Sequence, residues 1–328
     1  MCINIFLYYM LMPDCIKADS ITDIKHYNLR YNYDHCNYST NIFYTVFSSI
    51  INVNDLKENL DQPDWVVVDT RYDLADIGAG KKAYLDAHIP GALFADINDD
   101  LSGPPLTDHG RHPLPSAEQL NRLFSRLGIN NNTQVVVYDQ VSGSFAGRLW
   151  WLLRYMGHEQ VAVLNGGWQM WEKAGFPVRS GEETRQQENF LGVPRSDWLI
   201  TVDQIPASRL LVDSRDPVRY RGDSEPLDRA AGHIPGAINH FWKDNLDENG
   251  LFKSPEIIHS EFKKFLGSIH PEEAVFYCGS GVTACHNLLA AAFAGLPVPK
   301  LYAGSWSDWC SDTTRSVVVG GEPGHFEK

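Results

Sequence analysis

Hydrophobic positions follow two alternating patterns from about residue 46 onward. Short runs of branched and aromatic residues, such as Trp65–Arg71 (WVVVDTR) and Gln134–Asp139 (QVVVYD), have the length and composition of buried strands. Between them, PSAEQLNRLFSRLG and FAGRLWWLLRYMG repeat apolar residues at helical spacing and stop at Gly128 and Gly157. Strands that alternate with helices predict an α/β fold built on a mainly parallel sheet.

The same series of landmarks occurs twice. VVVDTR, HIPGAL, VVVYD and VLNGGW return in the same order, at a nearly constant offset, as LLVDSR, HIPGAI, AVFYC and LYAGSW. Such a repeat indicates a tandem duplication. We predict two α/β domains, at residues 46–182 and 199–328, joined by a polar linker at 183–198. Each should be a doubly wound, mainly parallel sheet with helices on both faces.

Residues 1–45 differ from the rest in being rich in Tyr, Asn and Ile. Their apolar run, Ile3–Met12, is shorter than the roughly 20 residues that a membrane helix needs. It also lacks a basic n-region and a small-residue cleavage site, although a signal peptide stays open as an alternative. We expect a poorly ordered extension and assign it no function.

Charge and cysteine usage narrow the class of partner. The chain has 28 Lys+Arg against 41 Asp+Glu, a net charge of -13, which argues against nucleic acid or an anionic membrane as the main partner. An anionic ligand would need a local basic island. The six cysteines have neither CxxC nor zinc-finger spacing, so we expect no disulfide framework, no metal and a reducing cytoplasm.

Candidate chemistry gathers at Cys278. The run Val275–Tyr277 ends on this cysteine, a glycine-bearing turn follows, and an apolar helical pattern begins. Backbone N–H groups and the helix dipole at such a strand-to-helix turn stabilise a thiolate. A buried, inert core cysteine is the alternative. The first copy carries Asp139 at this point, which cannot do thiol chemistry, so we expect one active site per chain.

Together these features resemble the rhodanese superfamily, specifically its two-domain sulfurtransferases with an inactive N-terminal and an active C-terminal domain. The resemblance rests on the paired Asp-x-Arg strands, HIPGA segments and Gly-x-Trp turns, and on the single loop CGSGVTAC. The loop is similar to that of 3-mercaptopyruvate sulfurtransferases. Thiosulfate sulfurtransferases more typically carry two basic residues where Gly279 and Ser280 stand.

The resemblance implies that Cys278 takes a sulfur from a small anionic donor, becomes a persulfide, and passes the sulfur to cyanide or a thiol. The thiol could be thioredoxin or a low-molecular-weight compound. Gly279 and Gly281, with Val282 beside them, would let successive N–H groups form an anion nest. Ser280 and Thr283 would donate hydroxyl hydrogen bonds. No cofactor is implied.

Positive charge for the donor should come from the segment DSRDPVRYRGDSEPLDR. By resemblance, Arg221 corresponds to the arginine that holds the donor's carboxylate, and Arg229 is a weaker second candidate. His88 is a weak candidate from the silent domain, and Arg148 and Asp76 are weaker candidates of the same kind. Surface charge is the alternative for Arg221, and a histidine that caps a turn is the alternative for His88.

Other interpretations concern structure or a different activity. We expect Arg71 and Arg215 to pair with nearby acids and Cys285 to be a packed core thiol. Thiosulfate is the close alternative donor. The dual-specificity phosphatases that share the fold need an arginine where Ala284 stands, and non-catalytic binding modules usually lack the cysteine.

Overall fold

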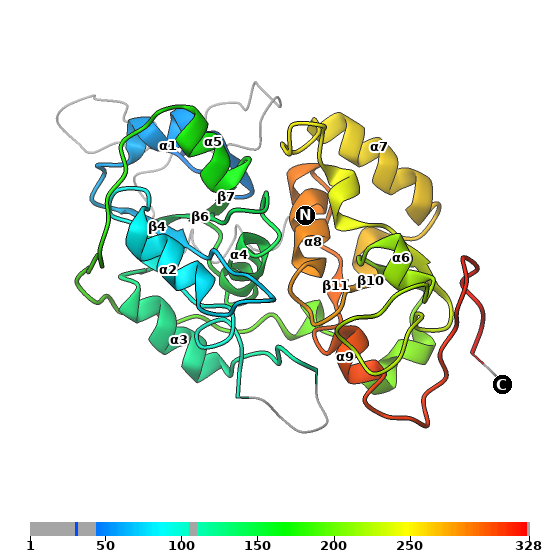
Figure 1. Ribbon diagram of the computed structural model, residues 1–328. Helices are drawn as coiled ribbons and strands as arrows, with labels where there is room; N and C mark the ends of the chain where they lie inside the picture. The colour runs from blue at the N-terminus through cyan, green and yellow to red at the C-terminus, as the bar shows by residue number, and fades with distance from the viewer. Residues whose placement is uncertain (1–29, 32–43, 105–109, 327–328) are drawn as a thin grey trace, which may run out of the picture. The chain divides into compact units, whose positions relative to one another are not determined.

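The computed structural model describes residues 30–31, 44–104 and 110–326 (Figure 1). Contacts divide the chain into two units, Met1–Ser48 and Ser49–Lys328. Within the first unit, β1 (Arg30–Tyr31) pairs antiparallel with β2 (Tyr44–Thr45). The expectation of a poorly ordered N-terminal extension falls mostly outside the described residues. No described helix is long and apolar enough to cross a membrane.

The first half of the second unit is built on a five-stranded sheet of order β3-β7-β6-β4-β5, in which every pairing is parallel. Five helices accompany it. The strands are β3 (Ile50–Ile51), β4 (Trp65–Asp69), β5 (Leu93–Phe94), β6 (Gln134–Tyr138) and β7 (Val161–Leu164). The helices are α1 (Val53–Asn59), α2 (Ala79–Asp86), α3 (Ala117–Arg126), α4 (Ala146–Tyr155) and α5 (Gly167–Lys173).

The second half repeats the design with a four-stranded parallel sheet of order β11-β10-β8-β9. The strands are β8 (Leu210–Asp213), β9 (Ala237–Asn239), β10 (Ala274–Tyr277) and β11 (Lys300–Leu301). The α-helices are α6 (Pro217–Tyr220), α7 (Pro255–Leu266), α8 (Ala284–Phe293) and α9 (Ser305–Trp309). Short 3₁₀ segments are η2 (Ser196–Trp198), η3 (Val202–Ala207), η4 (Trp242–Asn245) and η5 (Pro271–Glu273). The predicted fold class is confirmed.

Local sequence explains these elements. The five residues of β6 are all buried, as a strand covered on both faces requires. Helix α3 begins at a capping box in which Ser116 and Gln119 satisfy each other's backbone N–H groups. Residues 182 to 195 form neither helix nor strand. The sequence-based domain boundaries themselves stay predictions.

The internal repeat extends to buried side chains. Arg71 donates through Nε to Asp69, and Arg215 donates in the same way to Asp213. In each copy a buried tyrosine of the neighbouring strand approaches this pair, and Tyr138 Oη donates to Asp69 at 2.7 Å. The prediction that both arginines pair with nearby acids is confirmed.

The two halves meet through α4 and α8, which face each other in Figure 1. A Cβ atom on Gly147 of α4 would lie 3.2 Å from the backbone nitrogen of His286, so glycine permits this close approach. His286 Nε2 lies 3.1 Å from the carbonyl oxygen of Ser142 in the first half. This joint holds the N-terminal end of α8, and with it the loop that carries Cys278, against the first half.

Candidate active site

The loop that joins β10 to α8 begins at Cys278 and contains several backbone N–H groups without an acceptor in the described part of the chain. Cys278 N–H donates to Ser305 Oγ (3.1 Å), and the carbonyls of Cys278 and Gly279 accept from the start of α9. Among the described residues, the N–H groups of residues 279–283 have no acceptor. They are therefore available to an anion at the sulfur, as the predicted nest requires.

The first half contains the same kind of turn with an anion already in it. Asp139 is fully buried, and its carboxylate accepts from the backbone N–H groups of Val141, Gly143, Phe145 and Ala146 at 2.7–2.9 Å. Burial raises the pKa of Asp139, and these four hydrogen bonds oppose that shift. The turn in the first half thus binds a buried carboxyl side chain through four backbone N–H groups. In the other copy Cys278 stands at that point.

Two glycines give the loop its shape. Gly281 has φ +77°, and a Cβ there would lie 2.3 Å from the carbonyl oxygen of Ala303, so no other residue fits without movement. A Cβ at Gly279 would lie 2.9 Å from Arg111 Nη2 and 3.3 Å from Arg219 Nη1. The missing side chain of Gly279 therefore makes room for two guanidinium groups beside the residue that follows Cys278.

Arg111 and Arg219 form the basic island that an acidic chain needs. Arg219 belongs to α6, whereas Arg111 comes from the first half, and its backbone N–H donates to Ser307 Oγ of the second half at 3.0 Å. Burial and the charge of Arg219 lower the pKa of Arg111 from its ordinary value. Both guanidinium groups also pair with Asp228. The island is thus shared between the two halves of the fold.

Ser280 is hydrogen-bonded to a histidine of the first half. His112 Nδ1 lies 2.7 Å from Ser280 Oγ, and His112 Nε2 lies 3.0 Å from Asn98 Oδ1. Since the amide oxygen only accepts, Nε2 carries the ring proton and Nδ1 accepts from the serine hydroxyl. Burial, with the charges of Arg148 and Arg111, lowers the pKa of His112 to about 4. The imidazole is therefore neutral at physiological pH.

Arg148 of α4 fastens these parts together from a fully buried position. Its Nη1 donates to the carbonyl oxygen of Gly281 at 2.9 Å, and its Nη2 donates to those of His112 and Leu101 at 3.2 and 3.3 Å. One guanidinium group thus fixes both the cysteine loop and the segment that brings His112. Arg148 is a positioning residue.

The structure brings some predicted residues together and places others elsewhere. Val282 is buried, and Thr283 is half-buried at the start of α8, where its side chain does not cap the helix. Cys285 is a core thiol as predicted, since burial raises its pKa to about 12. Asp76 is exposed and accepts from the backbone of Gly78.

Three predicted substrate-binding residues make other contacts. Arg221 is 40% exposed and donates to Asp223 at 2.8 Å; Arg219, two residues earlier, is the arginine that reaches the loop. Arg229 is exposed and donates to the carbonyl oxygen of Ser311. His88 is buried in its own half, where Nδ1 contacts the carbonyl oxygen of Tyr84 and the ring stacks on the Tyr84 ring.

Sequence reasoning included Arg219 only as part of the basic segment DSRDPVRYRGDSEPLDR, and it missed Arg111, His112 and Asn98. Arg111 and His112 lie in the run HGRHPLP, in which an arginine and two histidines follow one another closely in an acidic chain. That local basic cluster was the available signal. Asn98 offered none, because it stands in a polar turn among acids.

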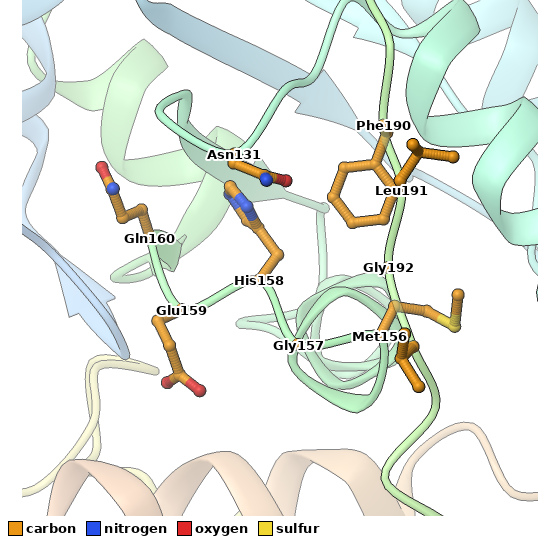
Figure 2. A pocket seen from close by; sticks show the side chains of 10 residues that line it. Asn131, Met156, Gly157, His158, Glu159, Gln160, Phe190, Leu191 and Gly192 are labelled. Carbon is orange, nitrogen blue, oxygen red and sulfur yellow. The ribbon is translucent and has the colours of Figure 1, made fainter. Parts of the chain in front are cut away.

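A separate hollow lies away from this chemistry. It has a volume of about 460 Å³ and lies between the C-terminal end of α4 and the extended segment 190–193 (Figure 2). Its walls include His158, Phe190 and Asn131. None of its lining residues belongs to the loop 278–283. In the part of the chain that the structure describes, no group of three or more His, Cys, Asp or Glu could hold a metal ion.

Comparison with known proteins gives the class. The model of the rhodanese-like domain matches twice, at residues 52–174 and 200–312. A protein of Pseudomonas aeruginosa named probable 3-mercaptopyruvate sulfurtransferase is 42% identical over 280 residues, covering 83% of this chain and 99% of that protein. The thiosulfate sulfurtransferase of Rattus norvegicus is 35% identical over 257 residues, covering 75% and 85%.

A solved structure agrees. The 3-mercaptopyruvate sulfurtransferase from Leishmania major superposes with a TM-score of 0.71 at 30% identity, covering 79% of this chain and 73% of that one. The chain belongs to the rhodanese family. Within this family it is a sulfurtransferase, an enzyme with a sulfur donor and a sulfur acceptor as substrates.

Proposed function

We propose that this sulfurtransferase takes sulfur from 3-mercaptopyruvate and transfers it to a thiol through a persulfide on Cys278. The observation that carries the proposal is the hydrogen bond between Ser280, in the cysteine loop, and the neutral His112. A 2-keto thiol needs a proton moved when its carbon–sulfur bond breaks, whereas thiosulfate releases sulfite and needs none.

In the first step the Cys278 thiolate attacks the donor's sulfur. A sulfur–sulfur bond forms, the carbon–sulfur bond breaks, and its electron pair passes to the adjacent carbon as the enolate of pyruvate. The thiol proton of the donor ends on that carbon. Ser280, which shares a proton with His112 Nδ1, is a group in the loop that can carry it. N–H groups of residues 279–283 would stabilise the persulfide anion.

The donor's carboxylate would be held by Arg219, with Arg111 beside it. A guanidinium group binds a carboxylate through two parallel hydrogen bonds, and these two lie against Gly279, next to the nucleophile. This assignment replaces Arg221. Thr283 stays a candidate donor to the enolate, because its hydroxyl does not cap α8.

In the second step the acceptor thiol gives its proton to the outer sulfur of the persulfide anion, and the resulting thiolate attacks that sulfur. The sulfur–sulfur bond to Cys278 breaks, a new one forms to the acceptor, and the Cys278 thiolate is restored. Thioredoxin or a low-molecular-weight thiol is the acceptor we propose, in a reducing cytoplasm. Such an acceptor must reach a sulfur whose residue is only 1% exposed in the resting protein. The residues that cover Cys278 therefore have to move before the acceptor's thiol reaches the sulfur.

Thiosulfate is the alternative donor, favoured by the presence of two guanidinium groups at the loop and by relatives named for it. Steady-state kinetics with both donors, and cyanide or a thiol as acceptor, separate the two. We expect a higher kcat/KM for 3-mercaptopyruvate. A higher value for thiosulfate would reverse the assignment. Cys278→Ser should abolish transfer from both donors while leaving the thermal unfolding transition in place.

A further inference from the structure

Two buried acids lie on the same guanidinium groups that face the cysteine loop. Glu225 accepts from Arg219 Nη2 at 2.7 and 2.9 Å, and Asp228 accepts from Arg219 Nη2 at 3.1 Å and from Arg111 Nη1. The side chains of Glu225 and Asp228 are 3% and 4% exposed. Carboxylates are rarely so deeply buried unless paired, so their charges belong to the site.

The two acids are held differently. Glu225 also accepts from Arg215 Nη1 at 3.2 Å and from the backbone N–H groups of Leu227 and Asp228 at 3.1 and 3.2 Å. These extra bonds make Glu225 part of the turn that follows α6. Among the described residues, the carboxylate of Asp228 contacts the guanidinium groups of Arg111 and Arg219. Asp228 therefore serves the electrostatics of the two arginines.

The charges of Arg111 and Arg219 are offset by the acids that bind them. Arg111 and Arg219 contribute two positive charges, Glu225 and Asp228 two negative ones, while Arg215 is balanced by Asp213. An anion that approaches Gly279 thus meets guanidinium donors whose charge is offset, and the remaining positive charge at the loop is that of Arg148, which donates to the carbonyl oxygen of Gly281. A donor with one carboxylate can use the guanidinium N–H groups that face the loop. A dianion with concentrated charge is repelled by Asp228 about twice as strongly.

We propose that Asp228 is a specificity-determining residue that favours singly charged donors, such as 2-keto thiols, over dianionic ones. This inference rests on the proposed function for its first donor, but the charge argument applies to any anion at the loop. It assigns donor choice to a carboxylate that weakens the attraction of the two arginines for an anion, in addition to the neutral pair Gly279 and Ser280. Removing this one charge should then admit dianions.

The test is Asp228→Asn, which keeps the size of the side chain and removes its charge. The ratio of kcat/KM for thiosulfate to kcat/KM for 3-mercaptopyruvate should rise about tenfold, the order expected for one unit charge a few ångströms away in a partly solvated site. The matched control is Asp223→Asn, which removes the same charge from the same segment. Asp223 is 56% exposed and pairs with Arg221, so the ratio should stay unchanged.

A binding experiment separates this inference from the proposed function. In the Cys278→Ser protein, calorimetry should show that Asp228→Asn tightens sulfate binding by a larger factor than pyruvate binding. If the unaltered protein transfers no sulfur from 3-mercaptopyruvate, the proposed function fails while this arm still tests Asp228.

Three outcomes would overturn the proposal. They are an unchanged donor ratio, an equal gain for both anions, or the same change in Asp223→Asn. Should the amide disturb packing, Asp228→Ser is the second variant, judged by thermal melting. Failure of both variants to fold would make Asp228 a structural residue and would equally reject the inference.

Discussion

At the scale of single residues, two arginines on one short helix have different surroundings. Arg219 lies within α6, and Arg221 follows at its C-cap with helical φ and ψ angles. Two helical residues turn the side-chain direction by about 200°, so the two guanidinium groups point to opposite sides. Arg219 therefore faces Gly279 and its acids, while Arg221 faces Asp223 in solvent. We assign donor binding to Arg219 alone of this pair.

Arg219→Ala should raise KM for 3-mercaptopyruvate by about ten- to a hundredfold, because a charge-assisted bidentate contact contributes about 1.5–3 kcal/mol. Arg219→Lys should give an intermediate KM, since it keeps the charge and loses the planar fork. Arg221→Ala is the control and should leave KM within a factor of two, as expected for an exposed pair. Steady-state kinetics check all three. An effect at Arg221 equal to that at Arg219 would contradict the assignment.

At the scale of elements, the strand-to-helix turn decides what each half can do. In the first turn, backbone N–H groups bind the buried carboxylate of Asp139, whereas in the second the N–H groups of residues 279–283 have no acceptor among the described residues, and Cys278 stands at the corresponding point. A carboxylate consumes the donors permanently in the first half. In the second half they stay available for a persulfide. The two halves thus share a strand-to-helix turn, with a carboxylate in one copy and a cysteine in the other.

Gly281→Ala tests the shape of this turn. The change adds a Cβ in a φ > 0 conformation and places it 2.3 Å from the carbonyl oxygen of Ala303. The matched control is Gly236→Ala, which has φ +80° but nothing within 4 Å of the added atom. Gly236→Ala should lower the free energy of unfolding by about 1 kcal/mol. Gly281→Ala should lower it further and abolish persulfide formation, measured by denaturant unfolding and by mass spectrometry.

A result in which both glycine variants behave alike would show that backbone strain, and not the contact with Ala303, determines the conformation of the loop.

Much of this element could be predicted from the sequence. A β-branched run, a cysteine, Gly-Ser-Gly and an apolar helix are local signals, and local patterns determine strand, turn and helix. The facing direction of Arg219 could not be predicted, because the start of so short a helix decides it.

At the scale of the whole second unit, the site is completed by contacts between distant parts of the chain. His112 and Ser280 are 168 residues apart in sequence, and the donors of Arg148 reach acceptors from both halves. The segment that supplies Arg111 and His112 has no periodicity, so no pattern predicts where it docks. A charge count could suggest that an acidic chain concentrates its few cations. Packing between the halves, which includes that of α4 on α8, brings Arg111 and His112 to the loop that begins at Cys278.

Two buried histidines at contacts between the halves predict how the stability of the protein responds to acid. Burial lowers the pKa of His112 to about 4 and that of His286 to about 3, and each ring contacts an oxygen of the other half. An unfolded chain binds protons at these rings near pH 6.5, whereas the folded one does not. The free energy of unfolding should therefore be insensitive to these groups above about pH 6.5 and fall as pH drops toward 4.

For His112 the loss is up to about 3 kcal/mol. His158 and His240 also have lowered pKa values and contribute with the same sign, so variants are needed to isolate the joint. His286→Gln should flatten the acid limb of a plot of Tm against pH, because it removes a buried ring that must be neutral. His270→Gln, at a side chain 58% exposed, should leave that limb unchanged. Identical acid limbs for both variants would mean that the two halves are not held together through a neutral His286.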